Sequence, residues 1–225
     1  MKWALTKIYE GIYLLEMNDA YDLAMHFLRA QEYYESPNPM FRNHKFSIID
    51  LMEWYSKENN NCFTYATDWV GFNIPSRVLE DLYIFGGFSD FNKYDLFMRN
   101  IHYLISGQEN SYYLIGAKFG EVEDKDHELA HAFFYTNQEY KKQTLQLLNT
   151  IDTKIIDCFR YFLTSNGYTD EVVEDEIQAY MATGLTETMN EFVLDKMHIK
   201  QKELDAICKT IQNIFQKFKK ELDNG

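Results

Sequence analysis

The chain has 225 residues, of which 46% are hydrophobic and 25% charged, and its formal net charge is −13. This length is enough for one domain with a sizeable buried core. The excess of acidic residues argues against a nucleic-acid partner, because contacts with phosphates require clusters of Lys and Arg.

The first half of the chain is predicted to contain both strands and helices. Segments rich in Ile, Tyr, Phe and Leu predict strands at 8–17, 62–74 and 111–119. Apolar residues at helical spacing predict helices at 18–34, 46–55, 76–84 and 93–105. The strand at 111–119 has two interpretations: at a sheet edge it would bind an extended peptide, and inside the sheet it would be an ordinary core strand.

The second half of the chain is predicted to be helical throughout. Its helices are expected at 126–136, 138–149, 152–165, 170–183, 187–197 and 199–222. Strands followed by helices predict an α+β fold, with a small mixed sheet in the N-terminal half and a mainly helical C-terminal half. We expect a single domain over residues 1–225, with residues 186–225 as a helical C-terminal extension packed on it.

A short motif near the middle of the chain predicts metal chemistry. Residues 127–131 read His-Glu-Leu-Ala-His. Residues four apart share one face of a helix, so His127 and His131 can bind one metal ion together. Zinc binds imidazole nitrogen and keeps an open position in catalytic sites. Glu128, next to the first ligand, can then take a proton from metal-bound water.

A catalytic zinc needs a third protein ligand, and the acidic stretch 170–180 offers two main candidates. Glu174 has mainly polar neighbours three and four residues away, whereas the neighbours of Glu176 are apolar, at positions 172, 173, 179 and 180. A carboxylate on an apolar helix face is costly unless it is paired or bound to a cation. Glu176 is therefore the predicted third ligand, with Glu174 as the alternative.

Through His127, Glu128, His131 and Glu176, the chain resembles the zincin metallopeptidases, and among them the gluzincins. The Glu-x-x-Ala spacing that ends at Ala179 is similar to the second motif of the ImmA/IrrE-type peptidases. The resemblance covers about residues 111–136 and 172–183. It implies a zincin-like fold, zinc as the cofactor and a peptide or protein substrate.

The chain also departs from the patterns of known zincins. Phe134 and Asn137 occupy the Gly and His positions of the subclass that has a third His in its motif. Thermolysin-like enzymes carry an Asp four residues after the ligand Glu, where this chain has Tyr180. The sequence therefore does not assign a subfamily.

The resemblance implies roles for residues around the metal. Glu128 would act as general base and then as proton shuttle. Tyr135, one turn after His131, and Tyr180, one turn after Glu176, are candidate donors to the oxyanion, although either could be a packing residue. Two alternatives remain open: a zincin-like module that binds a protein partner without hydrolysis, and an iron enzyme with the same two-His-one-carboxylate ligands.

Cysteine use and the N-terminal sequence predict the compartment. Cys62, Cys158 and Cys208 are widely spaced and odd in number, which predicts reduced thiols and a reducing environment. No uninterrupted apolar run is long enough for a signal peptide or a membrane span. We expect a cytoplasmic protein without a membrane partner, and export without a cleavable signal is also compatible with the sequence.

Overall fold

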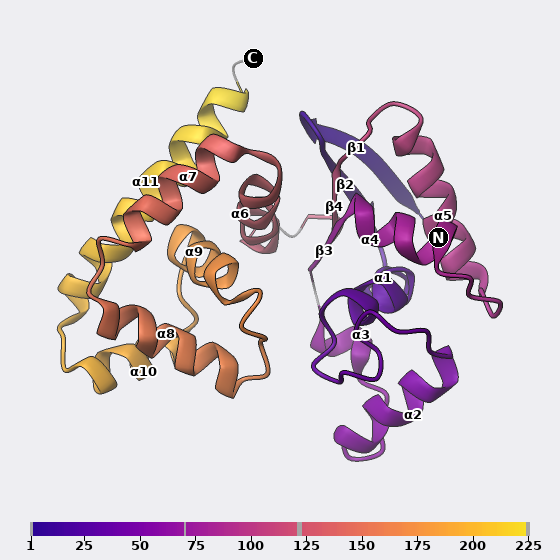
Figure 1. The fold of residues 1–225 in the computed structure, drawn as a ribbon, viewed down its shortest axis with the longest axis horizontal. Helices are drawn as coiled ribbons and strands as arrows, with labels where there is room; N and C mark the ends of the chain where they lie inside the picture. Colours follow the sequence, from indigo (N-terminus) through magenta and orange to yellow (C-terminus); the bar gives the residue numbers. More distant parts are fainter. Residues whose placement is uncertain (1, 70, 121–122, 224–225) are drawn as a thin grey trace. The chain divides into compact units, whose positions relative to one another are not determined.

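The computed structural model describes residues 2–69, 71–120 and 123–223, apart from the side chains of 123, 124, 222 and 223. The chain divides into two compact units, Met1–Lys125 and Asp126–Gly225 (Figure 1). We call them the sheet unit and the helical unit. The sequence does not predict the boundary between Lys125 and Asp126. The expectation of a single zincin-like domain over residues 1–225 stays a prediction. Position 70 of the predicted strand 62–74 lies outside the described residues.

The sheet unit contains the small mixed sheet that the sequence predicts. In the part of the chain that the structure describes, its strands are β1 (Trp3–Tyr9), β2 (Ile12–Met17), β3 (Phe72–Pro75) and β4 (Tyr113–Lys118). They lie in the order β1-β2-β4-β3. β2 is antiparallel to β1 and parallel to β4, while β3 is antiparallel to β4. Together with the helices of both halves, this sheet confirms a mixed α and β architecture.

Two of the predicted strands differ from the structure. The predicted strand at 8–17 covers the end of β1, a turn and β2, because Gly11 takes a positive φ of 67° and reverses the chain between the two strands. In the predicted strand at 62–74, residues Tyr65–Asp68 form a short helix, α3. The Asp68 carboxylate accepts hydrogen bonds from Thr64 and Tyr55 there, so local bonds override the strand propensity of the aromatic residues.

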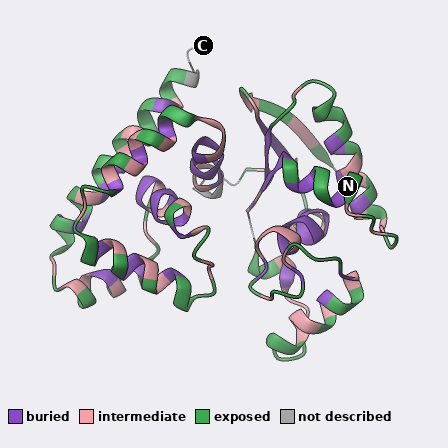
Figure 2. Ribbon diagram, viewed as in Figure 1, coloured by how far each residue is buried: buried purple, intermediate pink, exposed green. Residues whose placement is uncertain are grey.

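β4 lies in the interior of the sheet. It pairs with β2 along one side and with β3 along the other, and its residues are mostly buried (Figure 2). Its main-chain groups are therefore already used in the sheet. The interpretation of 111–119 as an edge strand that binds a peptide is wrong, and the core-strand interpretation is confirmed.

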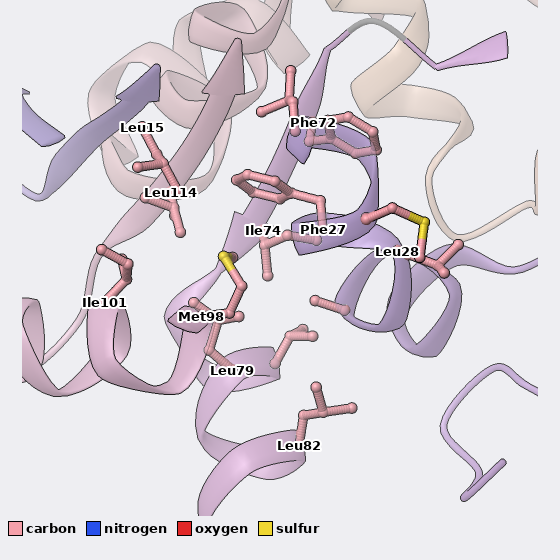
Figure 3. Packing of buried hydrophobic residues seen from close by; sticks show 14 of the residues in the cluster. Leu15, Phe27, Leu28, Phe72, Ile74, Leu79, Leu82, Met98, Ile101 and Leu114 are labelled. Carbon is pink, nitrogen blue, oxygen red and sulfur yellow. The ribbon is translucent and has the colours of Figure 1, made fainter. Parts of the chain in front are cut away.

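The core of the sheet unit forms where helix α1 (Ala20–Glu35) packs on the sheet (Figure 3). The Phe27 ring stacks on Phe72 of β3, with 5.0 Å between ring centroids. Phe27 also lies directly over Gly116 of β4, where an added Cβ would come within 2.5 Å of the ring. The missing side chain at Gly116 is therefore what lets α1 approach the sheet so closely.

The remaining helices of the sheet unit surround this core. They are α2 (Ile48–Glu58), α3, α4 (Ser76–Glu80), the π-helix η1 (Asp81–Phe85) and α5 (Lys93–Ser106). Arg29 of α1 is buried and donates from Nε and Nη2 to the two carboxylate oxygens of Asp95 on α5, at 2.9 and 3.1 Å. This paired geometry satisfies both buried charges and fixes α5 against α1.

Among the described residues, six helices lie in the helical unit or begin just before it, close to the predicted positions. They are α6 (Glu123–Thr136), α7 (Gln138–Leu148), α8 (Thr153–Ser165), α9 (Val173–Thr183), α10 (Glu187–Met197) and α11 (Gln201–Asp223). Within this unit α11 packs against α7 and α9, and α10 packs against α8. Rings of Phe133, Tyr140, Phe215 and Phe218 form aromatic contacts between α6, α7 and α11. Helix α11 therefore packs on α6 and α7 through its aromatic residues, and a C-terminal extension over residues 186–225 stays a prediction.

No described helix combines the length and the apolar composition that crossing a bilayer requires.

Replacing Gly116 by Ala should destabilise the sheet unit. The added Cβ overlaps the Phe27 ring, and overpacking a core in this way costs about 1–3 kcal/mol of unfolding free energy. Urea unfolding followed by tryptophan fluorescence measures this cost selectively, because Trp3, Trp54 and Trp69 all lie in the sheet unit.

Gly107→Ala is the matched control for this substitution. Gly107 ends α5 with a φ of −68°, and an added Cβ would come no closer than 3.5 Å to its nearest neighbour. We expect its unfolding midpoint to stay near that of the unmodified chain. Equal midpoints for the two variants would contradict the packing described for Phe27 and Gly116.

Candidate metal centre

Helix α6 brings the two histidines of the motif together. His127 and His131 lie one turn apart on the same face, as their spacing predicts. Their Nε2 atoms are 3.2 Å apart, and their ring centroids are separated by 4.8 Å. His131 is buried and His127 is partly buried. The two ring nitrogens therefore converge on one point inside the helical unit.

Helix α9 supplies the carboxylate. Glu176 Oε1 lies 3.7 Å from His131 Nε2, and Glu176 Oε2 lies 3.9 Å from His127 Nε2. Glu176 is buried between apolar residues of α9, whereas Glu174 is exposed. Of the two predicted candidates, the structure thus brings Glu176 to the histidines and leaves Glu174 at the surface.

The donor set and its spacing fit a zinc ion. One ligand atom from each of His127, His131 and Glu176 can be chosen so that all lie within 4.8 Å of one another. Tetrahedral ligands at about 2.0–2.1 Å from zinc lie about 3.3 Å apart. The two Nε2 atoms are 3.2 Å apart, and they lie 3.7 and 3.9 Å from different oxygens of Glu176. Two imidazole nitrogens and one carboxylate also leave the fourth position open.

Both imidazole rings are held from behind by hydrogen bonds. The Thr183 hydroxyl donates to the Ala179 carbonyl at 2.8 Å, so its oxygen accepts from His127 Nδ1 at 3.3 Å. Asp175 Oδ1 lies 2.9 Å from His131 Nδ1. A proton on each Nδ1 leaves each Nε2 lone pair for the centre of the site.

The charges around the site favour a cation at its centre. Burial lowers the pKa of His127 to about 3, and the charge on His131 adds to this effect. Burial also acts to lower the pKa of His131. The carboxylates of Asp175 and Glu176, with a smaller contribution from Glu128, outweigh burial and raise that pKa well above its usual value. The raised pKa of His131 indicates that the surrounding carboxylates favour a positive charge at this position.

The predicted catalytic residues lie on the same two helices. Glu128 follows His127 directly on α6 and is buried. The Tyr180 ring on α9 packs against His127, with 4.7 Å between centroids, and burial raises its pKa. Its hydroxyl shares a hydrogen bond with that of Tyr168 at 3.2 Å. Tyr135 is half-buried on α6, and its catalytic role stays a prediction.

The sequence does not predict four residues at the site, namely Tyr168, Asp175, Gln178 and Thr183. Gln178 is one of the polar neighbours of Glu174 from which the sequence predicts a solvent-exposed helix face. In the structure Gln178 is fully buried. A signal for it was present, because Met181 and Ala182, three and four residues later, are both apolar. Asp175 likewise has Ala179 four residues later, which places it at the edge of the apolar face.

Comparisons of the chain with protein-family models, with curated proteins and with solved structures find no match. The functional assignment below therefore rests on the residues of the site and their geometry.

Exchanging each candidate carboxylate for its amide should separate the two predicted third ligands. Glu176→Gln should weaken zinc binding by more than about 100-fold, since even changes outside the ligand set cost 10–100-fold. Glu174→Gln makes the same chemical change two residues away on an exposed position and should leave zinc affinity unchanged. Competition with a chromogenic chelator measures the zinc affinity of both variants. A larger loss in Glu174→Gln would contradict the site described here.

Proposed function

We propose that this protein is a zinc-dependent peptidase that hydrolyses peptide bonds. The observation that carries the proposal is the convergence of His127, His131 and Glu176 within 4.8 Å, with the buried Glu128 directly beside the first histidine. This donor set is the one that catalytic zinc sites use, with one position left for water or substrate.

Each residue has a definite task in this proposal. His127, His131 and Glu176 would hold the zinc ion, which supplies Lewis acidity and lowers the pKa of a water molecule. Glu128 accepts a proton from the attacking water, whose oxygen forms a bond to the scissile carbonyl carbon. As the carbon–nitrogen bond breaks, Glu128 returns the proton to the leaving amine. Hydrolysis thus consumes one water and regenerates the Glu128 carboxylate.

Tyr180 is the better of the two candidate oxyanion donors. Burial raises its pKa, so its phenol is neutral and has a proton to donate. Its ring touches His127, which brings it to the same ligand cluster, and the hydrogen bond with Tyr168 restrains its hydroxyl. A donor that is fixed in advance stabilises the developing negative charge without reorganisation.

Hydrolysis explains the site better than the two alternatives. A module that only binds a partner has no use for a buried carboxylate at Glu128, next to a metal ligand. An iron oxygenase also uses two histidines and one carboxylate, but the helical His-Glu-x-x-His arrangement adds the base that hydrolysis needs. Metal analysis and absorption spectra of the purified protein separate zinc from iron.

Glu128→Gln should abolish hydrolysis and keep the metal. General-base catalysis contributes about 10²–10⁴-fold, so we expect peptide cleavage to fall by that factor while one zinc per chain remains bound. Cleavage of a fluorogenic peptide library measures the rate, and elemental analysis measures the zinc.

Glu174→Gln serves as the control for Glu128→Gln because it makes the same change at an exposed site. It should cleave at the rate of the unmodified protein. If Glu128→Gln retains full activity with zinc bound, the proposed mechanism is wrong. If the unmodified protein binds zinc but cleaves no peptide, the binding-module alternative replaces it.

Tyr180→Phe should lower kcat and leave zinc affinity and KM nearly unchanged. Removing one donor to an oxyanion costs about 10²–10³-fold in kcat, whereas the phenyl ring retains the packing against His127. Tyr135→Phe is the matched comparison on α6 and should have little effect. Steady-state kinetics of the two variants decides between them, and a loss confined to Tyr135→Phe would assign the donor role to that residue instead.

A further inference from the structure

A continuous set of hydrogen bonds lies behind the metal ligands. It runs from Tyr140 on α7 through Gln178 and Asp175 on α9 to His131 on α6. Tyr140 Oη donates to Gln178 Oε1 at 2.7 Å. Gln178 Nε2 donates to Asp175 Oδ1 at 2.9 Å and to the Ala130 carbonyl at 3.2 Å. Asp175 Oδ1 in turn lies 2.9 Å from His131 Nδ1.

The partners of Gln178 allow only one orientation of its amide. The Asp175 carboxylate and the Ala130 carbonyl can only accept, so the amide nitrogen must face them. The amide oxygen then faces Tyr140, whose hydroxyl must donate to it. Gln178 is fully buried, where a reversed amide would leave several polar groups unsatisfied at considerable cost. The amide is therefore locked in one position.

This locked amide joins the two helices that carry the metal ligands. Its bond to Ala130 reaches the backbone of α6 between His127 and His131, while Gln178 itself lies two residues after Glu176 on α9. Through Asp175 it also fixes the ring of His131. One buried side chain thus controls both the spacing of the helices and the direction of a ligand nitrogen.

We propose that Asp175 and Gln178 are positioning residues of the metal centre, with Tyr140 as their anchor. Asp175 accepts a hydrogen bond from Nδ1 of His131, which directs Nε2 of the ring toward the metal. Gln178 fixes Asp175 relative to the Ala130 carbonyl on α6 by donating to both. Partners of this kind typically contribute 10–100-fold to metal affinity. The inference rests on the metal centre of the proposed function and assigns that centre two residues outside its ligand set.

The test measures zinc affinity by chelator competition and ligand geometry by the absorption spectrum of the cobalt-substituted 225-residue chain. Asp175→Asn should bind zinc about 10–100-fold more weakly and shift the cobalt bands. Glu174→Gln removes the same charge from the neighbouring exposed position and should change neither readout. Gln178→Met and Tyr140→Phe alter no charge. We expect zinc affinity to fall about 10-fold in Gln178→Met and by less in Tyr140→Phe, and these losses would show that the residues act by positioning the ligands and not through their charge.

A purely structural role predicts a different result. Variants that lower only the thermal midpoint, with zinc affinity and cobalt spectra like those of Glu174→Gln, would overturn the inference. If Asp175→Asn does not fold, heteronuclear NMR of the imidazole nitrogens in the unmodified zinc-loaded protein decides. His131 should be protonated at Nδ1 and bound through Nε2, and the opposite assignment would overturn the inference.

The outcomes separate this inference from the proposed function. Zinc binding that depends on Asp175 in a protein that cleaves no peptide supports the inference and refutes the peptidase. If the protein cleaves peptides and its zinc affinity does not change in the Asp175 and Gln178 variants, the peptidase is supported and the inference is refuted. A failure of the unmodified chain to bind zinc overturns both.

Discussion

Buried carboxylates require a compensating positive charge, and the candidate site is organised by this requirement. The helical unit buries Glu128 and Glu176 and holds Asp175 partly buried beside them. Carboxylates removed from water are costly unless a cation or several hydrogen-bond donors offset the loss of hydration. His131 can meet the requirement with a proton, as its raised pKa indicates. A divalent metal meets it more fully, because it carries twice the charge.

The two helices that carry the candidate ligands are closely packed. Ala130, Ala132 and Ala179 are fully buried on α6 and α9, and such small side chains let two helix backbones approach each other. Close approach is what allows Gln178 to reach the Ala130 carbonyl directly. Hydrogen bonds of this kind hold the three candidate ligands in place, so that binding a metal ion would require less ordering of these side chains.

Helical periodicity predicted the central part of the site from sequence. The spacing of His127 and His131 requires only that the segment be a helix, and the apolar neighbours of Glu176 correctly predicted its burial. Both inferences depend on contacts within one helix, which a single sequence encodes. The helices of the second half were predicted for the same reason, since their apolar residues recur at regular spacing.

The parts that sequence did not predict depend on contacts between elements. Asp175 and Gln178 are polar, and nothing local shows that α6 and α7 lie against them. The hairpin forms because β2 pairs with β1, a contact between two strands that the composition of residues 8–17 does not show. The helical turn at Tyr65–Asp68 depends on a hydrogen bond from Tyr55 on another helix. The interior position of β4 likewise follows from pairing with β2 and β3, which lie far from it in the sequence.

The X-ray absorption spectrum of the zinc-loaded 225-residue chain is the most direct test of the proposed metal centre. The site described here predicts nitrogen and oxygen ligands alone at about 2.0–2.2 Å, with the scattering pattern of two imidazole rings. Sulfur at about 2.3 Å would contradict it, because that distance would assign the metal to a cysteine such as Cys158 or Cys208 of the helical unit instead of to His127, His131 and Glu176.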